Sequence, residues 1–174
     1  MLGPGDPAPA FRVQPIFGLP VHTGGRPLVV LFLRSLSGGL ARAAITEAEK
    51  ALLRLDTAGV GMVAFTRCDL TLARDYVPRQ HVLFPIVVEP DNARFDAWGV
   101  GRDRGLVRSL LGLRPDTVRT ALASLGLARG RPEGGADQLP AEFVVGADGT
   151  ILYARYGRTI FDLPDVEALC AALP

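Results

Sequence analysis

Two continuous apolar runs constrain the fold of this chain more than any other feature. They read PLVVLFL at residues 27–33 and VGMVAFT at residues 60–66. Runs of this length, rich in β-branched and aromatic residues, are typical of strands that are covered on both faces. Between them, apolar residues step by 4, 3, 4 and 3 positions, at Ala41, Ile45, Ala48, Leu52 and Leu55. This spacing predicts an amphipathic helix that ends near Gly59.

The rest of the chain continues the alternation of strands and helices. We expect a helix over 69–81, opened by Asp69 and closed or kinked at Pro78, because proline cannot donate a backbone hydrogen bond. The remaining expected elements are an extended arm with a small hairpin (1–26), a strand (82–90), a short helix capped by Asp91 or Asn92 (91–100), a hairpin (143–157) and a closing helix (163–173). The order predicts an α/β fold with a mixed sheet and helices on both faces.

Composition excludes several classes of function. The length of 174 residues fits one domain, and a net charge of +1 gives no general attraction to nucleic acid or to a membrane. No apolar run approaches the roughly 20 residues that span a bilayer, and the start MLGPGDPAPAF has no features of a secretory signal. The two cysteines are far apart, and no motif indicates a metal or a cofactor. We therefore expect a reducing, cytoplasmic setting.

Residues 101–138 interrupt the alternation and are expected to form a partly helical, then glycine-rich insertion. Between Gly101 and Arg131 there are seven Arg and only two Asp. Such a segment is either a solvated insertion or a docking surface for an acidic partner, an anionic ligand or a second copy of the chain. It has no aromatic residue to stack on bases, so nucleic-acid binding is disfavoured.

Three motifs in order resemble the peroxiredoxins of the alkyl hydroperoxide reductase/thiol-specific antioxidant (AhpC/TSA) family. They are GDPAPAF (5–11), the strand PLVVLFLR (27–34) and LPAEFVVGADGTILYARYG (139–157). The resemblance implies a thioredoxin-like fold in a single domain, 1–174, with an N-terminal extension and a helical insertion (101–138) before a strand that follows a cis proline. It also implies thiol peroxidase ancestry.

The turn FLRSLSGGLAR (32–42) departs from the family pattern. Relatives commonly read xFxRxxxCPxCR here, and aligning Arg34 and Arg42 with the two arginines places Gly38-Gly39-Leu40-Ala41 on the C-P-x-C positions. Gly38 and Ala41 then replace both redox cysteines, and Ser35 stands for a threonine often found three residues before the first. Neither Ser35 nor Ser37 has the redox chemistry of a thiol. We expect that standard peroxidase chemistry is lost at this turn.

Three further features, two cysteines and a proline, bear on whether the protein has a redox or a binding role. Cys68 follows the strand 60–66 beside Arg67 and near a helix start, so it is either an ordinary half-buried thiol or a displaced redox thiol. Cys170 is expected in the core. The resemblance implies a cis bond at Leu139–Pro140, beside a groove where relatives pair with a substrate or partner strand.

Arg34 and Arg42 either hold an anion at the turn or lie on the surface. The sequence thus favours a family member with a binding or regulatory role, acting through the groove, the insertion or a homodimer. The alternative is an oxidoreductase with Cys68 as its sole redox thiol.

Overall fold

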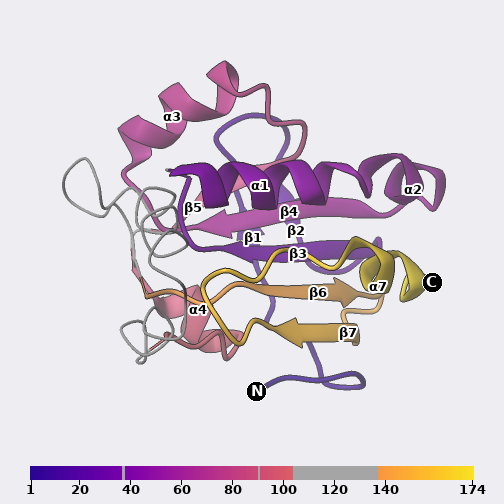
Figure 1. The fold of residues 1–174 in the computed structure, drawn as a ribbon. Helices are drawn as coiled ribbons and strands as arrows, with labels where there is room; N and C mark the ends of the chain where they lie inside the picture. The colour runs from indigo at the N-terminus through magenta and orange to yellow at the C-terminus, as the bar shows by residue number, and fades with distance from the viewer. Residues whose placement is uncertain (37, 90, 104–136) are drawn as a thin grey trace.

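The computed structural model describes residues 1–36, 38–89, 91–103 and 137–174 (Figure 1). Ser37 and residues 104–136 of the partly helical insertion expected over 101–138 lie outside the described residues. The architecture below concerns the described residues alone.

A five-stranded mixed sheet forms the centre, in the order β5-β4-β3-β6-β7 (Figure 1). Its strands are β3 (Leu28–Leu33), β4 (Gly61–Thr66), β5 (Ile86–Val88), β6 (Ala141–Val145) and β7 (Ile151–Tyr156). The pairs β3–β4 and β4–β5 are parallel, whereas β3–β6 and β6–β7 are antiparallel. Leu33 pairs with Thr66, so β3 and β4 end at the same edge of the sheet. The predicted mixed α/β sheet is confirmed.

The helix predicted after β3 is divided into α1 (Gly38–Glu49) and α2 (Leu52–Thr57). The amide of Lys50 donates to the carbonyl of Glu47, and that of Ala51 to Ala48. These bonds span three residues rather than four and tighten the chain into a 3₁₀-type turn, which separates the two helices.

The predicted cap of α3 (Leu70–Arg79) is confirmed. The carboxylate of Asp69 accepts from the backbone N–H groups of Thr71 and Leu72, at 2.8 and 3.1 Å. The helix continues one residue beyond Pro78.

The strand expected over 82–90 is shorter in the structure, because the amide of Val82 donates to Val77 and so closes α3. In α4 (Ala93–Ala97) the side chain that binds the helix start is Asp91, which accepts from Ala93 N at 2.9 Å. Asn92 makes no such bond.

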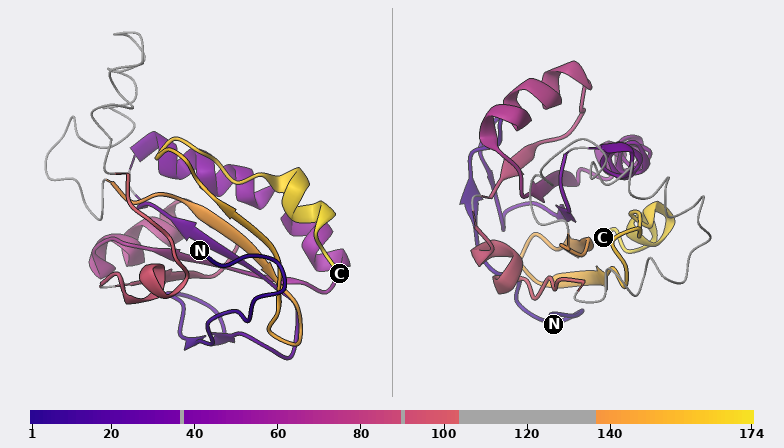
Figure 2. Two further views of the ribbon diagram at one scale, coloured as in Figure 1. Left: turned by 90° about the horizontal axis from the view of Figure 1, so that it is seen from below. Right: turned by 60° about the vertical axis from the view of Figure 1, so that its left-hand side comes forward.

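The two faces of the sheet are covered by different elements (Figure 2). Helices α1, α2, α3 and α7 (Val166–Ala171) pack on one face. The N-terminal arm, with the small hairpin β1 (Arg12–Val13) and β2 (Val21–His22), and α4 pack on the other.

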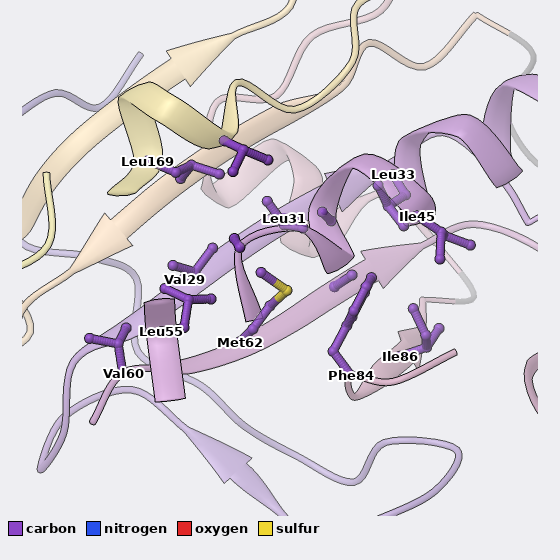
Figure 3. Close-up of a cluster of buried hydrophobic side chains, with 14 of the residues drawn as sticks. Val29, Leu31, Leu33, Ile45, Leu55, Val60, Met62, Phe84, Ile86 and Leu169 are labelled. Carbon is purple, nitrogen blue, oxygen red and sulfur yellow. The ribbon is translucent and has the colours of Figure 1, made fainter. Parts of the chain in front are cut away.

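Strand β3 supplies both cores. Val29, Leu31 and Leu33 lie in the core under the helices (Figure 3), and Leu28, Val30 and Phe32 in the other. This two-sided burial is why β3 has no polar residue.

Candidate functional site

The chain turns from β3 into α1 through a buried segment. Arg34, Ser35 and Leu36 are only 7%, 2% and 0% exposed. Helix α1 then begins at Gly38, and Gly39 in its first turn is exposed. The first N–H groups of a helix have no partner within the helix, and they form the positive end of its dipole. The turn therefore has the electrostatics of an anion site and no thiol.

A cavity of ≈ 30 Å³ lies beside this turn. Its walls come from the end of β3, the first turns of α1, the start of β6 and the segment after β7. Most of the lining side chains are apolar; they are Leu31, Phe32, Leu33, Leu40, Ala41, Ala44, Pro140, Ala141, Ile160, Leu163 and Pro164. The charged residues in the lining are Arg34, Glu142, Arg155 and Asp162. Apolar walls with a few polar groups are typical of small-ligand sites.

Arg34 brings a buried positive charge to the cavity. Its Nη2 atom has no hydrogen-bond partner among the described residues. Burial lowers the pKa of the guanidinium from its ordinary value, but an arginine side chain stays protonated at neutral pH. A buried donor without an acceptor is unfavourable, so this group is suited to bind an anion.

Glu142, which also lines the cavity, is the centre of a hydrogen-bond network. It is 3% exposed, and its Oε1 accepts from Arg155 Nη1 at 3.0 Å and from Tyr153 Oη at 3.2 Å. Its Oε2 accepts from the backbone N–H of Asp165 at 3.0 Å, at the start of α7. Burial raises the pKa of Glu142, and the bonds from Arg155 oppose that shift only in part. The network joins β6, β7 and α7.

Arg42 lies away from the cavity although it is in the same helix as Gly38. Its side chain is exposed and hydrogen-bonds the side chain of Gln80, just after α3. Of the two arginines considered for an anion, only Arg34 lines the cavity.

Sequence comparison decides the family. A sequence model described as AhpC/TSA antioxidant enzyme matches residues 48–159, which is more than half of the chain. The chain belongs to the AhpC/TSA family. The matched region begins after the turn at residues 34–42, so the family assignment rests on the sequence of residues 48–159.

Solved structures similar to this AhpC/TSA protein have the same fold at low identity. Peroxiredoxin Q of Xanthomonas campestris is 18% identical, with a TM-score of 0.61 over 86% of this chain and 78% of that one. Peroxidoxin BcpB of Mycobacterium tuberculosis is 12% identical, with a TM-score of 0.67 over 99% and 97%. A putative thiol:disulfide interchange protein DsbE of Chlorobium tepidum is 19% identical, with a TM-score of 0.65 over the full length of both chains.

No curated protein sequence matches the chain significantly. Among the described residues, no helix is long and apolar enough to cross a membrane.

Neither cysteine of this AhpC/TSA protein forms a disulfide among the described residues, and both are half-buried. Cys68 follows β4 by two residues, at the sheet edge where β3 also ends, and packs against the core under the helices. It is not among the described residues that line the cavity. Cys170 lies in α7 and packs against the same core.

The cis bond expected at Leu139–Pro140 is wrong: among the described residues no peptide bond is cis. The trans form of an X–Pro bond is favoured by about 0.5–1 kcal/mol. The backbone here is also paired, because Leu139 N donates to Gly101 O at 3.2 Å and Pro140 O accepts from Gly157 N at 2.8 Å. Pro140 still contributes to the cavity wall.

Gly157 tolerates this close approach because it has no side chain. A Cβ atom at this position would lie 2.6 Å from Pro140 Cγ and 2.9 Å from its carbonyl oxygen. We expect Gly157→Ala to lower the free energy of unfolding by about 1–3 kcal/mol, since the backbone must move apart.

Urea denaturation tests this expectation, with Gly3→Ala as the control, because no atom lies within 4 Å of a Cβ there. Equal stabilities of the two variants would contradict the close packing.

The sequence pattern predicted the turn and its two arginines as a candidate site, but Glu142 was not predicted. A signal was present, because Glu142 is the single charged residue within the strand AEFVV. A charge in a buried strand has a partner as a rule, so a cation near Glu142 is expected.

Proposed function

We propose that this AhpC/TSA protein has lost the redox cysteines of the family and binds a ligand at the strand-to-helix turn instead of oxidising a thiol. The main support for this proposal is a combination of three features at the turn. A cavity and a buried, incompletely paired Arg34 lie beside a helix start whose residues include no cysteine.

The chemistry of the family explains what the replacement removes. At a helix N-terminus, a cysteine has a lowered pKa and exists as a thiolate. The thiolate sulfur attacks one oxygen of the peroxide and the O–O bond breaks, so the cysteine becomes a sulfenic acid and hydroxide or an alkoxide leaves, which takes up a proton to give water or an alcohol. In the register set by Arg34 and Arg42, Gly38 occupies the position of that sulfur-bearing residue. A glycine cannot supply the electron pair.

A peroxide-consumption assay with dithiothreitol as the reductant tests the proposal. We expect the wild-type protein to show no turnover above the rate of dithiothreitol alone. Turnover that persists in Cys170→Ser and is lost in Cys68→Ser would contradict the proposal and favour the alternative.

The alternative is an oxidoreductase that uses Cys68, and it is supported by the parallel register of Leu33 and Thr66, which brings Cys68 to the sheet edge of the turn. The neighbouring Asp69 opposes it, because its capping bonds to Leu72 and Thr71 lower its pKa and keep it charged beside the thiol. In the same assay series, mass spectrometry after mild peroxide treatment would show a sulfenic adduct at Cys68 if this alternative holds.

The proposal extends to the binding partner and to the cellular location of the protein. A homodimer or a protein partner would use the arginine-rich segment within 101–138, with its seven Arg and two Asp between Gly101 and Arg131. A cytoplasmic setting is consistent with two cysteines that form no disulfide among the described residues.

A further inference from the structure

We propose that the cavity beside the turn binds a small organic acid, with its carboxylate on Arg34 and its short acyl chain between the apolar walls. This inference rests on the proposed binding function and adds the chemical class of the ligand. It is carried by Arg34, by the charges around it and by the composition of the walls.

The first step is the charge of the ligand. Arg34 is 7% exposed, and among the described residues it is part of no ion pair. A guanidinium group has only donors, so its free Nη2 must be matched by an acceptor. Arginine presents its donors as a planar fork that fits the two oxygens of a carboxylate.

The other charges of the cavity already have partners. Glu142 is neutralised by Arg155 at 3.0 Å. Asp162 accepts from the backbone N–H groups of Arg158 and Thr159, at 2.7 and 3.3 Å, and from the Thr159 hydroxyl at 2.8 Å. Arg34 is therefore the charged group of this cavity that has a buried donor without a partner among the described residues, and an anion would match it.

The second step is the rest of the ligand. The lining also includes Leu40, Ala44, Ile160 and Leu163, which offer no side-chain donor. An inorganic oxyanion would leave its outer oxygens against these apolar groups, which is unfavourable. An acyl chain buries apolar surface there instead. The cavity is small, at ≈ 30 Å³, so the chain is short.

The first turn of α1 strengthens the preference for an anion. Leu40 and Ala41 line the cavity within the first turn or so of a helix of 12 residues. The positive end of the helix dipole therefore lies near the proposed carboxylate. The helix dipole and the Arg34 guanidinium therefore both attract a negative charge.

Calorimetric titration of the full chain with propionate, at constant ionic strength, tests the proposal. We expect saturable binding of propionate and none of propionamide, which has the same shape without the charge. Arg34→Gln should weaken propionate binding at least about tenfold, because it removes charge-assisted hydrogen bonds. Arg42→Gln is the matched control and should bind as wild type, since Arg42 is exposed outside the cavity.

A second variant keeps the test decisive if Arg34→Gln does not fold. Ala44→Leu fills the apolar wall and leaves Arg34 in place, so it should weaken butyrate and propionate more than formate. Equal binding of propionamide or chloride, or unchanged propionate binding in both variants, would overturn the proposal. Absence of propionate binding without peroxide turnover would overturn only this ligand class, whereas peroxide turnover would overturn the proposed function.

Discussion

Replacing Glu142 with alanine is expected to lower the free energy of unfolding by about 3 kcal/mol, the lower end of the range for breaking a buried ion pair. The variant leaves Arg155 Nη1, Tyr153 Oη and the Asp165 N–H without this acceptor, where β6, β7 and α7 meet. The lower end applies because the Arg155 side chain is 36% exposed and water can solvate it in part. Urea denaturation measures the change.

Glu167→Ala is the matched control for Glu142→Ala. Glu167 also pairs with an arginine, Arg54, at 3.0 Å, but its side chain is 80% exposed. Exposed pairs contribute about 0–1 kcal/mol. An equal loss of unfolding free energy in both variants would show that the burial of Glu142 does not determine the size of the effect.

The pH dependence of the same network gives an independent measurement. Because burial raises the pKa of Glu142 in the folded protein, the folded state binds this proton more readily than the unfolded chain. Proton binding by Glu142 therefore stabilises the folded state. This stabilisation is complete below the pKa of about 4.3 that the group has in the unfolded chain, and it is lost as the pH rises through the pKa in the folded protein. Glu142→Gln, which keeps the shape without titrating, should therefore gain stability relative to wild type from about pH 4 upward.

Phe32→Ala is expected to lower the free energy of unfolding by about 3–5 kcal/mol. Phe32 is fully buried, and its ring lies 5.0 Å from Phe95, 5.4 Å from Phe65, 5.6 Å from Trp98 and 5.9 Å from Phe143. These rings come from separate elements that cannot all move inward to fill the space. The truncation therefore leaves a cavity in addition to the lost burial.

Phe17→Ala serves as the control for Phe32→Ala, because Phe17 is 53% exposed. We expect a change within about 0.5 kcal/mol for this surface position. Both midpoints should be measured with the same denaturant, and the slope of the transition should stay constant if only the folded core has changed.

The strands and caps were predictable where a local pattern carried the information. The run at 27–33 became β3, and Asp69 caps α3 as expected, because burial on two faces and a side-chain acceptor before a helix both leave a sequence signal. The division between α1 and α2 left no such signal. Residues 50–51 continue the helical pattern, and a tighter turn between two packed helices interrupts it.

The candidate site was predictable as a turn but not as a cavity. Arg34, Gly38 and Gly39 were placed at the helix start by their order along the chain. The network of Glu142 joins residues up to 23 positions apart, and the Leu139–Pro140 bond, predicted to be cis, is trans, with its backbone paired to Gly101 and Gly157. Such contacts depend on strand register, which a single sequence specifies only weakly.

The order of strands and helices, the family motifs and the absence of cysteine from the turn at 32–42 follow from the sequence alone, because each is a property of neighbouring residues. The tertiary structure decided which arginine is buried in the cavity and which is exposed beside Gln80. Arg34 and Arg42 have the same chemistry, and only the packing of β3, α1 and β6 around them distinguishes a buried charge from one that water solvates.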